Sequence, residues 1–364
     1  KNPMLDLPTP ALVIDAPTVR RNLRRLAAYA AGHGLKVRPH TKTHKSLRIA
    51  AMQLAEGASG LTVAKAGEAD VMAEAADDVL MAYPAVDARR CTAVADLAKR
   101  KTVRVALDSA TAARNLSAAA AAARSTVGVL VDLDVGLHRT GVQSPAAAVE
   151  LARLVDSLPG LRLDGLMFYP GHIGSKPDAQ AEALAAVSAV VGEALGLFAK
   201  AGLRAAVVSG GSTPTAYQSH LVRGQTEIRP GTYVFNDMNT VRGGYVGLDD
   251  CAARILCTVV SDAVPGQIVI DAGSKTLTSD RCGPAPDSGH GLIVEYPDAK
   301  IAKLNEEHGW VDVTGCDRAP KVGEQVTVVP NHICPCINLQ DRVYWREEGE
   351  APTLLNVDAR GRVF

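Results

Sequence analysis

Residues 127–142 read VGVLVDLDVGLHRTGV and carry the strongest indication of the fold. The first half, 127–134, is apolar on both faces, which is typical of a parallel strand buried between two layers. Asp132 and Asp134 stand where this run ends, and a glycine turn with a histidine and an arginine follows. A buried strand that ends in polar side chains predicts the C-terminal end of a barrel strand, where barrel enzymes carry their active sites. A polar surface loop is the alternative interpretation.

Runs of the same kind recur along the first two thirds of the chain, and helical stretches lie between them. Most of the runs are short, β-branched and apolar on both faces, as parallel strands between two layers must be. Eight such strands alternating with helices predict a (β/α)8 barrel rather than an open sheet. The predicted strands cover residues 36–42, 60–64, 79–83, 103–108, 127–134, 163–169, 205–209 and 227–235, and the predicted helices include 16–33, 109–124, 144–157 and 178–201.

The pattern changes after about residue 236, where short strand-like runs follow one another without comparable helices. Glycine and proline separate these runs, which is typical of antiparallel strands joined by turns. We therefore predict two domains, a barrel over residues 15–238 and a mostly antiparallel β domain made of residues 1–14 and 239–364. The strands expected in the second domain are 11–14, 254–261, 267–271, 291–295 and 325–329.

Composition and charge argue against several classes of function. The 364 residues are 47% hydrophobic, which allows a large core, and 39 basic residues balance 39 acidic ones. The sequence has no basic stripe of the kind that would indicate a nucleic acid or an anionic membrane as a partner. No apolar run reaches the about 18 residues that a membrane span needs. The start of the chain lacks the apolar region of a signal peptide, and the seven cysteines are irregularly spaced. We expect a soluble, cytoplasmic protein without a disulfide framework.

Residues 37–45 read VRPHTKTHK, and this segment is basic throughout, with five arginine, lysine or histidine side chains and no acid. Because a solvated charged face would mix both signs, the segment suits a strand that delivers Lys42 into a pocket. A lysine held among cations and partly desolvated has a lowered pKa, which lets the neutral amine form a Schiff base. A basic surface loop is the alternative.

Two loops that follow predicted strands carry further candidate residues. Residues 168–175 read FYPGHIGS and place Tyr169 and His172 beyond a strand end, although a lone histidine in a glycine-rich loop is usually just exposed. Residues 209–213 read SGGST, in which two glycines let the backbone approach a ligand while N–H groups and hydroxyls can cradle a phosphate. Their place after the seventh predicted strand, where barrel enzymes often bind phosphate, favours this interpretation. The segment 229–233, RPGTY, can close the same site.

Residues 330–339 read PNHICPCINL and hold a candidate pair of metal ligands. His332 and Cys334 are two residues apart, so on an extended segment both side chains point to one face and can bind zinc or another divalent ion. Cys336 continues the alternation and is a further candidate. A structural zinc site needs four protein ligands, so two ligands with open positions indicate a catalytic or activating metal. The alternative is a buried histidine with buried cysteines.

Taken together, these motifs resemble a known family of enzymes. The chain is similar to the metal-activated, pyridoxal-phosphate enzymes of fold type III that include D-threonine aldolase and eukaryotic-type D-serine dehydratase. The resemblance implies an alanine-racemase-like barrel followed by a β domain, bound pyridoxal 5'-phosphate, a divalent metal and usually a homodimer. It runs in order along nearly the whole chain, through RPHTKTHK (38–45), DVGLHRTGV (134–142), FYPGHIG (168–174), GGSTPT (210–215), TEIRPGTYVF (226–235) and NHICP (331–335).

The resemblance also implies roles for individual residues. Lys42 corresponds to the Schiff-base lysine, with Lys45 as its rival, and Arg139 corresponds to the arginine that bonds the phenolic oxygen of the cofactor. His172, or else a metal-bound water, is expected to accept the hydroxyl proton of the substrate. The remaining expected contacts are His40 with the cofactor, Tyr169 near its pyridine ring, Gly211, Ser212, Thr213 and Tyr233 in the phosphate cup, and His332 and Cys334 at the metal.

The activity implied first is cleavage of the Cα–Cβ bond of D-β-hydroxy-α-amino acids into glycine and an aldehyde, as in D-threonine aldolases. The alternative is metal-dependent dehydration of D-serine or D-3-hydroxyaspartate to a keto acid and ammonia. Cys334 favours the dehydratase, because aldolases of this family often have aspartate at that position. The segments GGSTPT and TEIRPGTYVFND resemble aldolases more closely, and we rank cleavage first. The residues leave open whether the metal is manganese, magnesium or zinc, and the D preference follows from the resemblance alone.

Two other functions fit fewer of these residues. A racemase of the same fold needs a second base, for which Tyr245 or Tyr296 is available, and it has no use for the metal pair His332 and Cys334. A non-enzymatic carrier of pyridoxal phosphate is a single barrel and lacks a long C-terminal β domain. We therefore expect an enzyme whose partner is a small amino acid.

Overall fold

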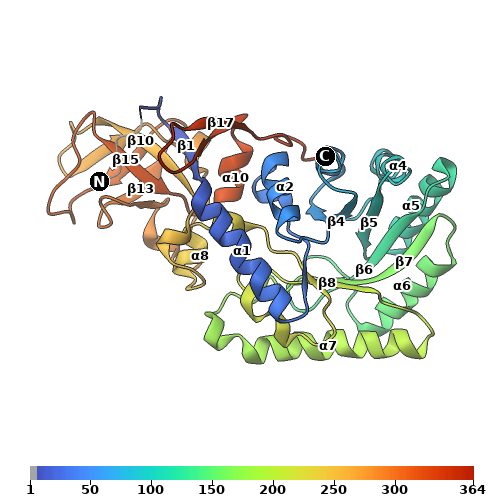
Figure 1. Ribbon diagram of the computed structural model, residues 1–364. Coiled ribbons are helices and arrows are strands. Elements are labelled where there is room, and N and C mark those ends of the chain that lie inside the picture. The colour runs from blue at the N-terminus through green and yellow to red at the C-terminus, as the bar shows by residue number, and fades with distance from the viewer. Residues whose placement is uncertain (1–5) are drawn as a thin grey trace. The chain divides into compact units, whose positions relative to one another are not determined.

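The structure, a computed structural model, describes residues 6–364, so residues 1–5 of the predicted β domain lie outside the described residues. The chain forms two compact units, which can be followed along the colour scale of Figure 1. The barrel unit consists of residues 23–231 and 361–364, and the β unit of the residues up to Asn22 and of Thr232–Arg360. The first boundary between the two units falls inside helix α1 (Ala16–Gly32), whereas the predicted domain boundary lies at residue 15.

Eight parallel strands build the barrel unit, which confirms the predicted (β/α)8 architecture. Neighbours in the sheet follow the order β2-β9-β8-β7-β6-β5-β4-β3. The two ends of this order meet at an isolated parallel bridge between His40 and Thr62, where the Thr62 N–H donates to the Pro39 carbonyl at 2.9 Å. The strands are β2 (Lys36–Val37), β3 (Leu61–Val63), β4 (Asp78–Met81), β5 (Thr102–Leu107), β6 (Val127–Leu133), β7 (Leu161–Phe168), β8 (Val207–Gly210) and β9 (Glu227–Ile228).

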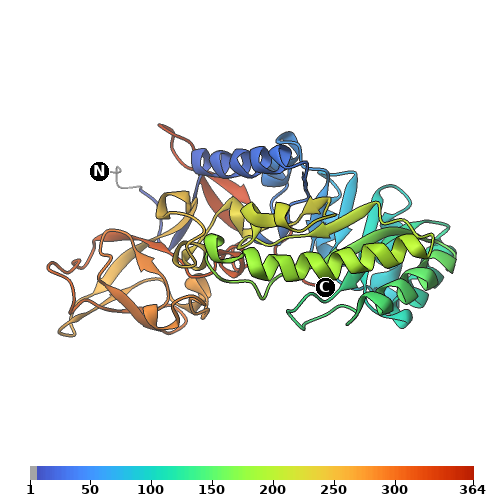
Figure 2. The same ribbon diagram turned by 90° about the horizontal axis from the view of Figure 1, so that it is seen from below.

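Helices alternate with these strands, and several begin at a side chain that caps the first turn. Ser109 and Ser144 each accept a hydrogen bond from the backbone N–H three residues on, which satisfies a donor that the helix itself leaves unpaired. Figure 2 shows α7 running along the barrel strands. The helices that follow α1 are α2 (Leu47–Ala55), α3 (Ala66–Met72), α4 (Ala88–Leu97), α5 (Ala110–Ala123), α6 (Pro145–Ser157) and α7 (Ala181–Lys200).

Helix α7 is long and apolar enough to cross a membrane, judged by length and composition alone. One such helix is weak evidence, because the core helix of a soluble protein passes the same test. The buried side chains of α7 follow the spacing of a helix that packs one face against a core. They are Leu184, Val187, Val191, Ala194 and Phe198. The absence of a membrane partner stays a prediction.

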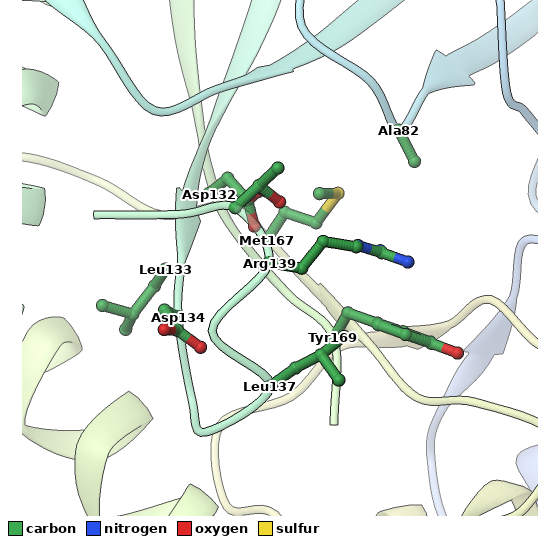
Figure 3. Close-up of a pocket in the computed structure, with 9 residues that line it drawn as sticks. Ala82, Asp132, Leu133, Asp134, Leu137, Arg139, Met167 and Tyr169 are labelled. Atoms are coloured by element: carbon green, nitrogen blue, oxygen red, sulfur yellow. The ribbon is translucent and has the colours of Figure 1, made fainter. Parts of the chain in front are cut away.

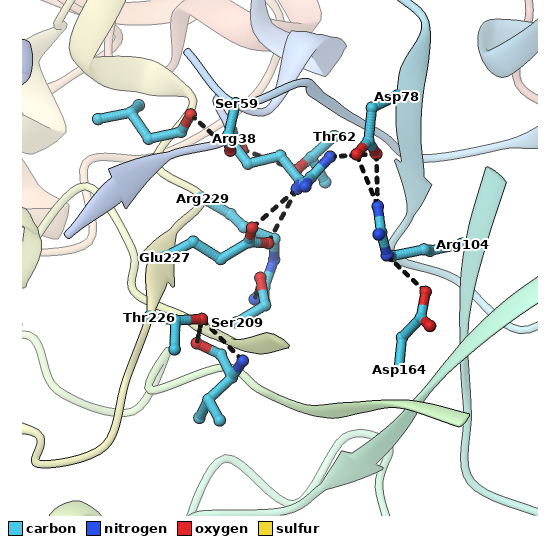
Figure 4. A network of polar contacts seen from close by, with 12 residues as sticks. Arg38, Ser59, Thr62, Asp78, Arg104, Asp164, Ser209, Thr226, Glu227 and Arg229 are labelled. Carbon is cyan, nitrogen blue, oxygen red and sulfur yellow. Dashed lines mark hydrogen bonds and ion pairs between the residues drawn. The ribbon is translucent and has the colours of Figure 1, made fainter. Parts of the chain in front are cut away.

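The interior of the barrel begins with a layer of ion pairs near the N-terminal ends of the strands (Figure 4). Arg38 donates to both carboxylate oxygens of Glu227, at 2.9 and 3.0 Å, and to Asp78 at 2.6 Å. Arg104 bonds Asp78 and Asp164, at 2.7 Å each. Removing ions from water is costly unless each charge is paired, and this network pairs them.

Apolar side chains fill the barrel above the ionic layer. Leu80, Ala106, Leu130 and Met167 form one buried cluster, contributed by β4, β5, β6 and β7. Because side chains alternate between the faces of a strand, Asp132 lies on the same inward face as Leu130. The ion pairs and the apolar cluster therefore fill the barrel interior, and polar side chains lie above them at the C-terminal ends of the strands.

Two predicted strands are shorter than expected. Strand β2 ends at Val37, and the residues that follow it form a single 3-10 turn, η1 (Thr41–Thr43). Strand β9 ends at Ile228, and the turn η4 (Thr232–Val234) replaces its predicted second half. The reason is local, since each segment contains a proline, at 39 and at 230, that has no N–H to donate to a sheet. The prediction that Lys42 ends a strand was therefore wrong, although it follows one closely.

The β unit is a nine-stranded sheet with pairs that are mostly antiparallel, as predicted. Strand β1 (Ala11–Asp15), expected from the apolar residues 11–14, lies between β10 and β16 and pairs with β16 in parallel. Short helices α8 (Met238–Arg242), α9 (Ser274–Leu277) and α10 (Ile333–Asn338) interrupt the strands. The other strands are β10 (Ala253–Ser261), β11 (Gln267–Ile270), β12 (Leu292–Ile293), β13 (Lys300–Leu304), β14 (Gly309–Asp312), β15 (Gln325–Val329), β16 (Arg342–Arg346) and β17 (Thr353–Asn356).

Candidate active site

Within the basic segment 37–45, Lys42 is the one basic side chain that the structure leaves exposed. Arg38 is buried and paired with two carboxylates of the ionic layer. His44 is buried, and its ring bonds the side chain of Gln53 at 3.0 Å and accepts the Ser46 N–H at 3.0 Å. A segment that looks uniformly cationic in the sequence therefore presents one amine to solvent at the C-terminal end of the barrel.

The rival lysine, Lys45, is held in a buried ion pair. Its Nζ lies 3.7 Å from Glu68 Oε2, and the two side chains are 6% and 1% exposed. The other oxygen of Glu68 accepts the Thr41 hydroxyl at 2.7 Å, so the turn is fixed on both sides of Lys42. The structure thus gives the two lysines different environments, one open and one enclosed.

The imidazoles of this segment are neutral bases rather than cations. Burial, followed by the nearby charges of Lys42 and Arg229, holds the pKa of His40 well below its ordinary value. Burial also lowers the pKa of His44 to about 4. The Nδ1 atom of His40 lies 3.4 Å from the backbone nitrogen of Lys42, so His40 caps the turn that carries the lysine.

A pocket opens at the C-terminal ends of β4, β6 and β7 (Figure 3). Arg139 and Tyr169 both line it, and the guanidinium carbon of Arg139 lies 4.9 Å from the centre of the Tyr169 ring. A guanidinium at this distance is attracted by the ring face, which orders both side chains. The complete lining is Ala82, Asp132, Leu133, Asp134, Leu137, Arg139, Thr140, Met167 and Tyr169.

The loop that presents Arg139 is fixed by carboxylates. Asp134 accepts the backbone N–H groups of Gly136 and His138, at 3.0 Å each, and these bonds bring the pKa of its carboxyl far below the ordinary value despite burial. Asp108, directly after β5, accepts the N–H of Gly141 at 3.0 Å. Sequence analysis placed polar groups here but did not identify Asp108.

His172 lies beside the same loop. Its ring packs against Gly136, so closely that a Cβ atom added to Gly136 would lie 2.8 Å from His172 Nε2. The side chain is exposed. The structure thus places His172 next to the loop that carries Arg139.

A glycine-rich loop, predicted as a phosphate cup, follows β8. Gly211 has φ +83°, a conformation that favours glycine, and a Cβ there would lie 3.0 Å from the Ile228 side chain. The Ser212 hydroxyl is buried and bonds the Thr215 hydroxyl at 2.9 Å, and Thr213 is half-buried. Backbone N–H groups and hydroxyls in such a turn suit a phosphate.

Arg229 lies behind this loop, fully enclosed. Its guanidinium donates to Ser209 Oγ at 2.9 Å and to the Phe168 carbonyl at 3.0 Å. Burial lowers its pKa to about 10, against the opposing effects of Glu227 and Asp132. Sequence reasoning treated Arg229 as part of a closing loop, and no local signal revealed that it is buried.

The predicted metal pair lies in the β unit at the start of α10. His332 is the residue before the first turn, and its Nδ1 lies 2.7 Å from Asp280 Oδ2. The Cys334 thiol is a further hydrogen-bond partner of the His332 side chain, and its Sγ lies 3.6 Å from the Thr232 hydroxyl. The predicted extended arm was wrong, but the helical turn also brings both side chains together.

Cys336 does not share the position of the pair. It is fully buried, and its S–H donates to the carbonyls of Leu277 and His332. Residues 6–364 contain no group of three or more His, Cys, Asp or Glu side chains arranged around a possible metal. Tyr233, the last expected phosphate contact, is a buried residue of η4 in the β unit.

The residues present fit both groups that the resemblance implies. For pyridoxal phosphate the barrel unit provides an exposed lysine, a glycine-rich turn with buried hydroxyls, and an arginine beside a tyrosine ring. For a divalent metal the β unit provides one imidazole nitrogen and one sulfur, both preferred by zinc. The carboxylate of Asp280 holds the imidazole in the way that bound metals usually require.

The chain is similar in sequence to known enzymes. The chain is 30% identical to D-threonine aldolase of Arthrobacter sp over 366 residues, which cover 99% of the chain and 94% of that protein. It is 32% identical over 353 residues to D-threo-3-hydroxyaspartate dehydratase of Delftia sp. (strain HT23), covering 91% and 92%. It is also 32% identical over 372 residues to 3-hydroxy-D-aspartate aldolase of Paracoccus denitrificans (strain Pd 1222), covering 99% and 94%.

Solved structures match over almost the whole chain. The D-threonine aldolase from Filomicrobium marinum superimposes with a TM-score of 0.91 at 31% identity, covering 99% of this chain and 97% of that one. A cysteine-to-alanine mutant of D-threo-3-hydroxyaspartate dehydratase, in the metal-free form, gives 0.88 at 29% identity, covering 98% and 99%. A family model, alanine racemase N-terminal domain, matches residues 14–238, and a second, putative serine dehydratase domain, matches residues 252–345. The chain therefore belongs to the family of the alanine racemase N-terminal domain and carries the putative serine dehydratase domain after it.

Proposed function

We propose that this protein cleaves the Cα–Cβ bond of D-β-hydroxy-α-amino acids, giving glycine and an aldehyde. At the coarser level its relatives are aldolases and a dehydratase, and the chain is a pyridoxal-phosphate-dependent lyase of this class. The observation that carries the proposal is the exposed Lys42, whose basic neighbours are buried, paired or neutral, on the barrel face that also carries Arg139 and Tyr169.

Residues of the barrel unit would hold the cofactor. Lys42 offers the amine that anchors it, Arg139 a positive charge for its phenolic oxygen, and the loop with Gly211 and Ser212 a cradle for its phosphate. When bound, pyridoxal phosphate supplies an electron sink for bonds at the substrate Cα. Tyr169 orients Arg139 through the ring contact, and Arg229 keeps the base of the loop in place through Ser209.

His332 and Cys334 would hold the divalent metal. Asp280 fixes the imidazole through Nδ1, which leaves Nε2 as the ligand atom. A metal bound there supplies a Lewis acid for the β-hydroxyl of the substrate. The nitrogen and sulfur ligands favour zinc over manganese or magnesium. We also infer a cytoplasmic homodimer that acts on small amino acids and binds neither nucleic acid nor membrane.

His172 is our candidate for moving the hydroxyl proton. Its imidazole is exposed beside the loop that carries Arg139, so it is accessible to a substrate bound at that loop. Loss of that proton lets the oxygen become a carbonyl while the Cα–Cβ bond breaks. A base that removes the hydroxyl proton favours cleavage over dehydration, and His172 is our candidate for that base.

Dehydration to a keto acid and ammonia is the second candidate. It is favoured by Cys334, which the family resemblance associates with dehydratases, and by the 32% identity to the Delftia enzyme. The identities to aldolases and to a dehydratase are so similar that they do not separate the two reactions.

Product analysis tests the proposal. The purified protein, with pyridoxal phosphate and zinc, manganese or magnesium, is given D-threonine, D-serine or D-3-hydroxyaspartate, with L-threonine and the Lys42→Ala variant as controls. Glycine together with the matching aldehyde supports the aldolase. A keto acid with ammonia supports the dehydratase instead, and neither product from any of the three substrates contradicts both.

A further inference from the structure

We infer that Asp132 is a positioning residue, whose ionised carboxylate holds Arg139 over the pocket and whose protonation releases it. The inference rests on the proposed function in one respect, namely that the molecule bound by Arg139 is pyridoxal phosphate. It adds a control by pH that neither the fold nor the family assignment contains.

The position of Asp132 is built into the barrel. It is the last but one residue of β6, on the inward face, and its side chain is 6% exposed. It lines the same pocket as Arg139 and Tyr169, as Figure 3 shows. Burying a carboxylate this deeply is costly unless it is paired and hydrogen-bonded.

The groups that face Asp132 come from three strand ends. Thr140, one residue after Arg139, donates its hydroxyl to Asp132 Oδ2 at 2.9 Å. Arg229, after β9, and Arg139 attract the carboxylate, and Asp108, after β5, repels it. The hydrogen bond to Thr140 ties the Asp132 carboxylate to the segment that carries Arg139, and the charge of Arg139 attracts that carboxylate.

Burial is the largest of these effects and raises the pKa of Asp132 to about 6. The carboxylate is therefore ionised above about pH 6 and neutral below it. Above that pH a negative charge faces Arg139, and below it this attraction is lost. The neighbouring Asp134 behaves differently, because hydrogen bonds bring its pKa far below the ordinary value, and it stays ionised throughout this range.

The test compares the dissociation constant of pyridoxal phosphate for Asp132→Asn with that for the unchanged protein between pH 5 and pH 8. The ratio of the two cancels the ionisation of the cofactor itself. We expect a ratio near one at pH 5 and about tenfold weaker binding by the variant at pH 8, the equivalent of one pKa unit of coupling. The half-change is expected near pH 6.

A double-mutant cycle separates positioning from direct charge repulsion. If Asp132 acts through Arg139, then Asp132→Asn has no effect at pH 8 in an Arg139→Gln background. Asp156→Asn, the same substitution at an exposed position of α6, is the control, and its ratio is expected to stay near one at every pH. A constant ratio for Asp132→Asn, tighter binding by that variant, or an effect that persists in the Arg139→Gln background overturns the inference.

Thr140→Val provides an independent measurement if Asp132→Asn does not fold, as judged by circular dichroism. The hydrogen bond from Thr140 lowers the pKa of Asp132, so its loss is expected to move the pH midpoint of cofactor binding upward. An unchanged midpoint counts against the inference. Because the readout is cofactor affinity, it is independent of product formation: a coupled ratio without any product contradicts the proposed lyase alone, and no binding of pyridoxal phosphate contradicts both.

Discussion

The ammonium of Lys45 lies 3.7 Å from Glu68 Oε2, and both side chains are buried next to the turn that exposes Lys42. Burial raises the pKa of Glu68, and the Thr41 hydroxyl and the Lys45 ammonium oppose that effect. The ion pair therefore fixes the turn. Lys45 has a structural role in it, whereas the exposed Lys42 is available to a ligand.

Removing Glu68 is expected to destabilise the protein. Glu68→Ala leaves Lys45 buried and unpaired, and breaking a buried pair in this way costs about 3–5 kcal/mol. Lys42→Ala removes an exposed side chain and is expected to change the free energy of unfolding by less than about 0.5 kcal/mol. Urea unfolding of both variants measures the difference. Equal stability of Glu68→Ala and the unchanged protein would show that the ion pair does not fix the turn.

Acid is expected to weaken the protein through His44. Burial lowers the pKa of this imidazole from 6.5 to about 4 in the folded state, so the unfolded chain binds more protons between these pH values. Its contribution to stability is complete above pH 6.5 and falls by about 3 kcal/mol as the pH drops to 4. Urea unfolding at several pH values should show a flatter dependence for His44→Gln. An identical slope for the two proteins refutes the assignment.

Crowding at Gly136 is expected to impair catalysis without unfolding the chain. A Cβ atom there would lie 2.8 Å from His172 Nε2, and the backbone φ of +133° disfavours any other residue. Gly136→Ala should displace the His172 imidazole and therefore reduce kcat relative to the unchanged protein. Gly192→Ala is the control, because nothing lies within 4 Å of its added Cβ and alanine favours the helix. Full activity in Gly136→Ala would remove His172 from the mechanism.

Metal content is expected to follow His332 and Cys334. Either residue changed to alanine should lose the metal, and Asp280→Asn should weaken its binding about 10- to 100-fold, because the carboxylate orients the imidazole. Cys336→Ala is the matched control, since its thiol bonds backbone carbonyls instead. Elemental analysis after dialysis measures all four variants. Metal lost from Cys336→Ala, or kept by the other three, would place the site elsewhere.

The sequence predicted the fold because the fold depends on repeated local patterns. The eight apolar runs and the β domain after about residue 236 were recognisable, since strand periodicity and turn residues are local signals. The errors came where local rules compete. Pro39 and Pro230 shorten two strands, and the segment after His332 forms a helical turn instead of an extended arm.

The environment of each site residue could not be predicted in the same way. The partners that enclose Lys45 and His44, Glu68 and Gln53, come from other elements, and no spacing in the segment 37–45 reveals them. The burial of Asp132 and Arg229 likewise depends on the closure of the barrel. Residue types were therefore identified from sequence, while their charge states required the structure.

The central claim, that Lys42 holds pyridoxal phosphate, has a direct test. Borohydride reduction of the protein with bound cofactor links the cofactor to its lysine, and mass spectrometry of the digested chain locates it. The account predicts the modification at Lys42 in the unchanged protein and its loss in Lys42→Ala. A modification at Lys45, or at any lysine of the chain other than Lys42, contradicts the account.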